Sequence, residues 1–288
     1  NVLAMPVVMG MKTDKEKFAG AERTYTIECM MHDKKALQNG TSHYFGNGFP
    51  TAFDITFTDK ENKQCHPYET SWGFTTRTIG GVIMTHGDNR GLVLPPRIAP
   101  IQVVVIPVAQ HKQGVLEANR AVMDRLKSAG FRVKLDDSDQ SAGWKFAEYE
   151  MKGVPLRLEL GPKDMEKNQC VLVRRDSGEK SFVSLDNIEQ TVAQMLDTIH
   201  DGLYAKAKKN LEDNTYACAT LEEVKEKMAV QGGFAKTMWC GDEACEVRMK
   251  EEAGVSSRCI PFEQEHLGDT CAICGKPAKH MVYWGVAY

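Results

Sequence analysis

The pattern of hydrophobic and polar positions predicts antiparallel strands and short helices up to about Pro96. Apolar and polar residues alternate over residues 53–57, which predicts a half-buried strand, and the polar run 58–63 predicts a turn. Residues 69–77 are aromatic and β-branched, which favours a strand. The two-residue period is lost over residues 78–86, which we interpret as a helix.

The pattern changes after residues 91–100, where three prolines in ten residues predict a linker. Residues 101–107 form a continuous β-branched run, typical of a strand buried on both faces. An amphipathic helix is predicted over residues 114–129, with Gly130 as its C-terminal cap, and a long helix over 186–211. Four more strands are predicted at residues 131–135, 154–160, 170–174 and 180–184. A short helix is predicted at residues 143–152. Strands that alternate with helices indicate an α/β layer domain with a mixed sheet.

The remainder, from about residue 212, has one charged helix at 221–228, two cysteine pairs and an aromatic C-terminus. It is too small and polar to bury a core by itself. The whole chain has 288 residues, which predicts two or three domains. Its 42% hydrophobic and 26% charged residues exclude collagen-like and disordered classes.

A net charge of −3 gives no global basic field that would indicate a nucleic-acid partner. The longest apolar run, around residues 101–108, is far shorter than a bilayer span, and no secretory signal opens the chain. We therefore expect a soluble, intracellular protein without a membrane partner.

The nine cysteines include two close pairs, Cys240 with Cys245 and Cys271 with Cys274. Such pairs supply two thiolates each to a tetrahedral zinc ion, and four thiolates leave no open position, so the predicted zinc is structural. A glycine beside a cysteine in each pair favours the tight turn of a zinc knuckle. Four unrelated reduced cysteines are the alternative, and Cys259 could replace one ligand.

Candidate chemistry in the first stretch centres on a small pocket. Ser42 and His43 are adjacent on a strand and point to opposite faces, which excludes a catalytic dyad. Thr41 and His43 can share a face, and Trp72 beside a glycine offers a flat wall. Arg77 could bind phosphate or carboxylate. A core tryptophan and a surface arginine are the alternative reading.

Several long blocks, in order along the chain, closely resemble the prolyl-tRNA synthetases. They are KEKFAG at 15–20, GTSH at 40–43, SWGFTTRTIG at 71–80, HGDN at 86–89, GLVLPPR at 91–97, GWKF at 143–146, KGVP at 152–155, GPKD at 161–164, the cysteine knuckles and the terminal VAY. The resemblance implies a class II synthetase of the archaeal/eukaryotic type. Such enzymes join proline to ATP as prolyl-adenylate and transfer the prolyl group to proline tRNA.

The implied fold is multidomain, α/β and α+β. Residues 1–98 would be the C-terminal part of the antiparallel class II catalytic sheet, including motif 3. Residues 99–205 would be the mixed-sheet α/β anticodon-binding domain, and residues 206–288 a small zinc-binding α/β domain. Motif 1, the motif 2 loop and the residues that hold the imino group of proline have no counterpart. We therefore expect the C-terminal portion of a longer, cytoplasmic, homodimeric enzyme, inactive alone.

The resemblance also implies residue roles. Arg77 matches the motif 3 arginine and would be catalytic while it binds ATP. The other ATP-side residues would be Gln38 and Thr41, with Gln38 also near magnesium. The proline-binding residues would be Phe18, His43, Trp72, Gly73 and Thr75, and the zinc ligands Cys240, Cys245, Cys271 and Cys274. Adenylation needs no enzyme nucleophile, because the carboxylate of proline attacks the α-phosphate. Asn39 stands where glycine is expected, which would narrow the nucleotide side.

Proline anticodons end in two guanines, whose edges carry donors and acceptors that charged side chains can read. The expected tRNA-binding residues are Lys145, Glu148, Glu150, Arg157, Glu159, Lys163 and Asp164. Arg157 and Glu159 leave the same face of one strand, about 6.6 Å apart by strand rise. A solvated face with internal ion pairs is the alternative for any one of these residues.

Two other classes of function compete with the enzyme. A non-catalytic tRNA- or protein-binding module derived from the synthetase would explain the missing motif 2, but not the retained residues on the ATP side. A zinc-ribbon structural protein would explain only the tail.

Overall fold

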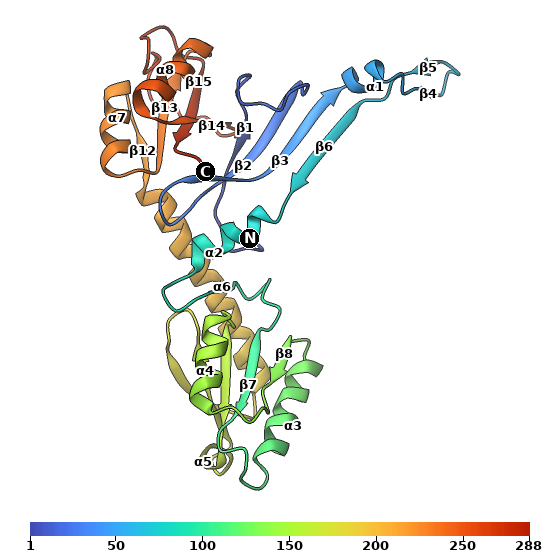
Figure 1. Cartoon of the computed structure of the whole chain (residues 1–288), viewed down its shortest axis with the longest axis vertical. Helices are drawn as coiled ribbons and strands as arrows, with labels where there is room; N and C mark the ends of the chain where they lie inside the picture. The colour runs from blue at the N-terminus through green and yellow to red at the C-terminus, as the bar shows by residue number, and fades with distance from the viewer. The chain divides into compact units, whose positions relative to one another are not determined.

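The computed structural model describes all 288 residues, and the chain forms two compact units. Unit 1 consists of residues 1–5 and 82–208, and unit 2 of residues 6–81 and 209–288. The limits between the units, at residues 81/82 and 208/209, fall within two helices, α2 (Arg77–His86) and α6 (Ile188–Asp213), which are labelled in Figure 1. No helix has the length and apolar character that crossing a membrane requires. The domain boundaries that we expect after residues 98 and 205 differ from the limits of these units, and they stay a prediction.

Unit 1 is built on a five-stranded sheet in the order β11-β10-β9-β7-β8. Its strands are β7 (Val103–Pro107), β8 (Val133–Leu135), β9 (Leu156–Leu160), β10 (Gln169–Arg174) and β11 (Lys180–Ser184). The central strand β7 pairs in parallel with β8 and β9, whereas β10 is antiparallel to β9 and β11. The expected mixed sheet is therefore confirmed, and so is the prediction that β7 is buried along its whole length.

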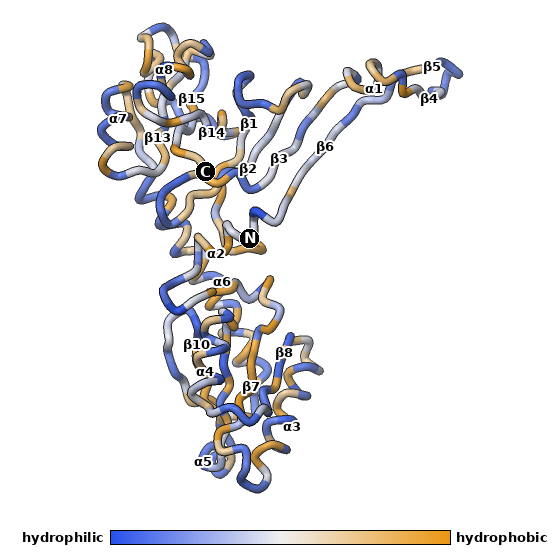
Figure 2. Tube along the Cα trace, viewed as in Figure 1, coloured by the Kyte–Doolittle hydropathy of each residue, from blue (hydrophilic) through white to orange (hydrophobic).

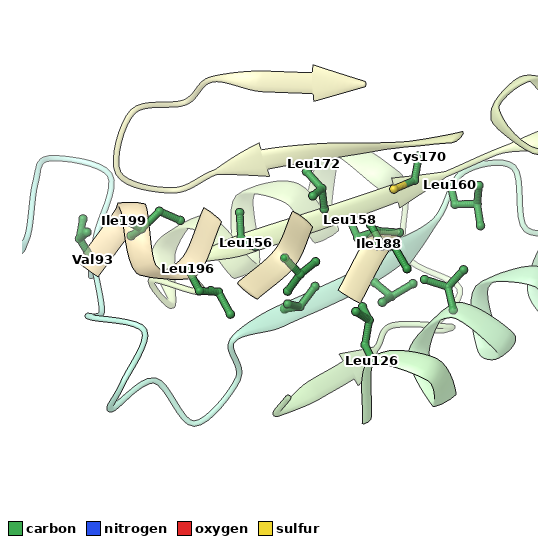
Figure 3. Packing of buried hydrophobic residues seen from close by; sticks show 14 of the residues in the cluster. Val93, Leu126, Leu156, Leu158, Leu160, Cys170, Leu172, Ile188, Leu196 and Ile199 are labelled. Atoms are coloured by element: carbon green, nitrogen blue, oxygen red, sulfur yellow. The ribbon is translucent and has the colours of Figure 1, made fainter. Parts of the chain in front are cut away.

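The helices of unit 1 are α3 (Val115–Ser128), α4 (Ala142–Met151), the short α5 (Pro162–Met165) and most of α6. Gly130 follows α3 with a φ of 91°, as expected for its cap. Apolar side chains of α3, α6, β9 and β10 meet in one core cluster (Figure 3). The alternation along β9 places its leucines in this cluster, which leaves Arg157 and Glu159 on the other face.

Unit 2 contains an eight-stranded sheet in the order β12-β13-β15-β14-β1-β2-β3-β6. Its strands are β1 (Val8–Met11), β2 (Arg23–Met30), β3 (Ala36–Gly46), β6 (Glu69–Phe74), β12 (Thr215–Ala217), β13 (Phe234–Trp239), β14 (Ser256–Pro261) and β15 (His280–Gly285). The strands from β1 to β6 are antiparallel, and β1 pairs with β14 through Gly10 and Pro261. The C-terminal segment thus shares a sheet with the N-terminal one. It also buries an apolar cluster formed by residues between 216 and 284, among them Val224, Met249 and Trp284, so the expectation that it is too small and polar to bury a core by itself is wrong.

The strand predicted at residues 53–57 is wrong. Helix α1 (Gly48–Ala52) ends at Phe53, and Asp54 has a φ of 53°, which turns the chain out of any strand. The helix is followed only by a hairpin whose strands are two residues long, β4 (Phe57–Thr58) and β5 (Gln64–Cys65). The expected polar turn joins these strands and is hydrophilic in Figure 2.

The last two helices are α7 (Leu221–Val230) and α8 (Glu243–Ala253). Helix α7 confirms the predicted charged helix, and Thr220 caps it by accepting a hydrogen bond from the N–H of Glu223. No hydrophobic pattern predicts α8, which begins between the cysteines of the first pair. Its cap is Asp242, whose carboxylate accepts from the N–H of Ala244.

Candidate functional site

One face of the sheet in unit 2 carries His43 in a network of hydroxyls. The register of β2 and β3 pairs His43 with Thr24 and Thr41 with Thr26, and directly paired residues of antiparallel strands point to the same face. The two ring nitrogens of His43 lie 3.0 Å from the hydroxyls of Thr24 and Thr41. The expectation that Thr41 and His43 share a face is confirmed.

Phe18 covers this histidine. Its ring centroid is 4.9 Å from that of His43, and its backbone N–H donates to the Thr24 hydroxyl at 3.1 Å. Loss of water around the imidazole lowers the pKa of His43, so the ring is neutral at neutral pH. A neutral imidazole flanked by hydroxyls and an aromatic ring suits a small ligand with polar and apolar parts.

A bulge in β3 brings Gln38 to the same face. The register shifts at Ile27, so that Gln38 pairs with Glu28 while Gly40 pairs with Ile27, and Asn39 is the extra residue. The Asn39 side chain is buried and donates to the Cys29 sulfur at 3.3 Å. The expectation that Asn39 narrows the nucleotide side is therefore wrong, because its amide points into the interior.

Arg77 begins helix α2 and stands beside Gln38. Its Nη1 donates to the backbone carbonyl of Gln38 at 3.3 Å, and its side chain is exposed without an ion-pair partner. A cavity of about 230 Å³ is lined by Arg77, Gln38, Arg258 and the C-terminal Tyr288. Arg258 lies 3.6 Å from the buried carboxylate of Glu28, so Arg77 is the guanidinium without a carboxylate partner that makes this cavity suitable for an anion such as phosphate.

Trp72 does not belong to the pocket around Phe18 and His43. It pairs with Ser42, which is adjacent to His43 and points to the opposite face of the sheet. There Trp72 is 78% exposed and lines a separate apolar cavity of about 460 Å³ with Tyr25, Phe74 and Phe262. The expectation that Phe18 and Trp72 form walls of one pocket is wrong.

The two remaining residues expected in the pocket lie in and after β6. Gly73 pairs with Thr41, so its backbone belongs to the His43 face, and no atom lies within 4 Å of a Cβ added there. Thr75 accepts a hydrogen bond from the backbone N–H of Arg77 at 3.3 Å. Gly73 thus leaves the space beside Thr41 open, and Thr75 helps to fix the start of α2.

The four cysteines of the two pairs gather in unit 2. The sulfur atoms of Cys240, Cys245, Cys271 and Cys274 all lie within 4.8 Å of one another. The Cys240 sulfur is 3.7 Å from those of Cys245 and Cys274. Four sulfurs at 2.3 Å from a tetrahedral zinc ion lie about 3.8 Å apart, so the set fits zinc.

The local backbone agrees with two zinc knuckles. Gly241 and Gly275 have φ values of 88° and 73°, which favour glycine at both turns. Hydrogen bonding from the backbone at Lys276 lowers the pKa of Cys274 to about 7, which favours a thiolate ligand. Cys259 lies buried in β14 and is not among the four sulfurs, so the alternative ligand is not needed.

Among the residues expected to meet tRNA, Lys145 is buried. It is 1% exposed, and its Nζ donates to the carbonyl of Asp136 at 2.9 Å and to the amide of Gln110 at 3.3 Å. A lysine held in this way is not part of an exposed charge cluster, which corrects that expectation. Its role toward tRNA stays a prediction, as do the roles of the other six.

Two of the seven residues line a cavity of about 210 Å³ in unit 1, and five cations surround it. Glu150 and Arg157 both contribute, together with Arg90, Arg174, Arg175, Lys180 and Tyr149. Arg157 donates to Glu159 at 2.9 Å and lies 4.1 Å from the ring centre of Phe146. Glu150 also pairs with Arg90 at 2.6 Å. The internal ion pairs that we gave as the alternative to tRNA binding are thus present at both Arg157 and Glu150.

The sequence reading missed Arg90, Arg174, Arg175 and Lys180. The predicted strands 170–174 and 180–184 contain the signal that could have revealed them: two adjacent arginines end one strand, and a lysine begins the next one after a short turn.

The other expected residues lie outside this cavity. Glu148 pairs with Lys152 at 2.6 Å, Lys163 is exposed, and Asp164 caps α5 by accepting from the N–H of Gly161 at 3.2 Å.

Comparison with known families matches both units. Residues 102–195 match the family described as anticodon binding domain. Residues 221–288 match the family described as prolyl-tRNA synthetase, C-terminal. The first match covers the five-stranded sheet, and the second covers both cysteine pairs.

Curated relatives match the chain from end to end. Proteins named proline–tRNA ligase are 60% identical over 288 residues in Clostridium botulinum strain Okra and in Ruminiclostridium cellulolyticum, and 58% identical in Clostridium novyi strain NT. The chain spans 60% of the length of each of these relatives. Since all three come from clostridia, they lend no support to the expected archaeal/eukaryotic-type branch.

Proposed function

Because the chain belongs to the prolyl-tRNA synthetase family, as the end-to-end matches at 60% identity show, we propose that it is part of a proline–tRNA ligase. The reaction joins L-proline to ATP, releases pyrophosphate and passes the prolyl group to proline tRNA. The observation that carries the proposal is the single sheet face on which Gln38, Thr41 and His43 lie beside an unpaired Arg77.

In this proposal unit 2 positions proline and ATP. Phe18 and His43 receive the proline ring, and the neutral imidazole is held by Thr24 and Thr41 so that it does not turn. Arg77 binds the phosphates and stabilises the charge that grows as the carboxylate of proline attacks the α-phosphate. Trp72 has no part in this pocket because it lies on the opposite face.

Magnesium would accompany ATP and offset phosphate charge. The amide oxygen of Gln38 suits it as one oxygen ligand, with the phosphates supplying others, because magnesium keeps few protein ligands. The four cysteines hold a structural zinc ion, since all four positions are thiolates. This ion fixes the segment that contains Tyr288 and takes no part in adenylation.

Unit 1 would read the anticodon of proline tRNA. The cavity with Glu150 and Arg157 offers a carboxylate acceptor and guanidinium donors, the two kinds of group that a guanine edge requires. Phe146 stacks with Arg157 and could receive a splayed base. A homodimer formed through the catalytic domain, a location in the cytoplasm and the archaeal/eukaryotic type complete the proposal.

The test is proline-dependent exchange of pyrophosphate into ATP by the full-length protein that contains this chain. We expect exchange with proline to be at least about tenfold faster than exchange with alanine, cysteine or glycine, because each methylene missing from the ligand costs about 1–3 kcal/mol. Aminoacylation of proline tRNA should follow. The isolated 288 residues should be inactive, because they contain no counterpart of the motif 2 arginine that enzymes of this family use. Exchange that is as fast with another of these amino acids as with proline, or no exchange with any, would refute the proposal.

A non-catalytic tRNA- or protein-binding module is the second candidate. The cation-lined cavity of unit 1 favours tRNA binding whether or not adenylation occurs. The two candidates separate in one experiment: a module would bind proline tRNA without any proline-dependent exchange by the full-length protein.

A further inference from the structure

Thr13 and Glu246 meet in the interior of unit 2, although 233 residues separate them. The Thr13 hydroxyl donates to Oε1 of Glu246 at 2.9 Å, and the Ser257 hydroxyl donates to the same oxygen at 2.5 Å. Both Thr13 and Glu246 are 2% exposed. Glu246 lies in the first turns of α8, directly after Cys245.

Thr13 is also the start of the turn that presents Phe18. Its backbone carbonyl accepts from the N–H groups of Glu16 at 3.1 Å and Lys17 at 2.9 Å. Asp14 and Lys15, which follow it, are exposed, so the buried contact of this turn is at Thr13. The turn ends at Phe18, whose N–H donates to Thr24.

The residue before Thr13 is held in a similar way by a second buried carboxylate. Lys12 donates to Glu28 at 2.8 Å, and the exposed fractions of these two side chains are 2% and 0%. Two consecutive residues therefore bind carboxylates from two different segments of the chain. The hydrogen bond of Lys12 holds the segment after β1 to β2. The hydrogen bond of Thr13 is the one that joins this segment to α8.

We propose that Glu246 is a positioning residue for the proline pocket: it fixes Thr13, and through the turn at 13–18 it sets the distance between Phe18 and His43. The inference rests on the proposed function, because it assigns the ring of proline to Phe18 and His43. Glu246 touches no substrate. It acts through the hydrogen bonds of Thr13 and Thr24.

The test compares two threonine-to-valine variants in the full-length enzyme. Thr13→Val removes the hydroxyl that binds Glu246. Thr237→Val is the matched control, because the Thr237 hydroxyl is also buried in unit 2 but accepts only from the indole of Trp284, at 2.9 Å. We expect both variants to lose similar stability, and Thr13→Val alone to raise the KM for proline about tenfold, with the KM for ATP within about twofold of the wild type.

Conservative variants protect the test against failed folding. Thr13→Ser and Glu246→Gln keep a donor and an acceptor, so both should leave the KM for proline within about twofold of the wild type. An equal KM for proline in Thr13→Val and Thr237→Val would overturn the proposal, as would a tenfold rise in Thr13→Ser.

A second readout does not depend on activity. The amide hydrogen of Phe18 should exchange with solvent faster in Thr13→Val than in Thr237→Val. If the wild-type enzyme showed no proline-dependent exchange, the proposed function would fail while this readout still tested the link. Equal exchange rates at Phe18 in the two variants would overturn the link itself.

Discussion

The two units bury different kinds of side chain at their centres. Unit 1 closes around a large apolar cluster, in which the leucines of β9 and the isoleucines of α6 are fully or almost fully buried (Figure 3). A smaller apolar cluster contains Val104 and Ile106 of β7. Unit 1 also buries charged residues, but they lie in α4 and in loops: Lys145, Asp136 and Arg175.

Unit 2 has smaller apolar clusters, and most of its buried charged residues lie in or directly beside the strands of its sheet. Lys12, Glu28 and Arg258 lie together where β1, β2 and β14 adjoin.

This difference shows two ways of holding a sheet together. In unit 1 the sheet and the helices packed against it come from one continuous stretch of chain, residues 82–208, and apolar burial supplies the stability. In unit 2 the sheet joins segments from opposite ends of the chain, and the join contains buried ion pairs and hydroxyls. Such groups are costly to break, since each lost partner leaves a buried polar group unsatisfied.

Removal of metal should produce the largest contrast between the units. Zinc bound by four thiolates contributes on the order of 10 kcal/mol of binding free energy. We expect about one zinc per chain, and after treatment with a strong chelator faster amide exchange in β13 and β15 of unit 2 but not in β7 and β9 of unit 1. Metal-free protein with unchanged exchange in unit 2 would exclude structural zinc.

Lys12→Met tests the buried ion pair of unit 2. It leaves the Glu28 carboxylate without its closest cation, with the Nε of Arg258 at 3.6 Å as the remaining one. The free energy of unfolding of unit 2 should fall by about 3–5 kcal/mol, measured by urea titration. Lys17→Met is the control, because its partner Asp14 is exposed and that pair should contribute at most about 1 kcal/mol. Equal effects would show that burial of the pair is unimportant.

Leu158→Ala tests the apolar core of unit 1. The side chain is fully buried in the cluster between β9 and α6, so the cavity should cost about 2–5 kcal/mol. Residue-resolved hydrogen exchange should show this loss in β7 and β9, with β13 and β15 unaffected. A matching loss in both units would mean that they unfold as one and would remove the contrast between them.

Arg157→Met separates the functions proposed for the units, with a smaller effect. It removes the guanidinium that lines the unit 1 cavity while it keeps an apolar side chain against Phe146. The KM for proline tRNA should rise by an amount equal to about 1–3 kcal/mol, while proline-dependent exchange stays unchanged. Lys127→Met, at an exposed residue of α3 outside the cavity and outside the expected tRNA-binding set, is the comparison variant. A parallel fall in exchange would contradict the assignment.

Most elements of unit 1 can be predicted from the sequence, because its contacts are local. The continuous apolar run of β7, the alternation along β9 and the glycine after α3 each determine structure within a few residues. The burial of Lys145 could not be predicted in this way. Its partners, Asp136 and Gln110, come from loops whose positions depend on the folded sheet.

In unit 2 the sequence predicts residues of the site better than their arrangement. The two cysteine pairs and the shared face of Thr41 and His43 follow from spacing. The bulge at Asn39 and the opposite face of Trp72 depend on strand register, which one strand alone does not reveal. Nor does any local pattern indicate that β1 pairs with β14, some 250 residues away.

The most direct test of the account is pyrophosphate exchange by Arg77→Ala in the full-length enzyme. Arg77 should be the cation that unit 2 offers to the phosphates, so its loss should reduce proline-dependent exchange about 10²–10³-fold, with the unfolding of unit 2 unchanged. Exchange at the wild-type rate by the folded variant would remove Arg77 from the reaction and contradict the proposed site.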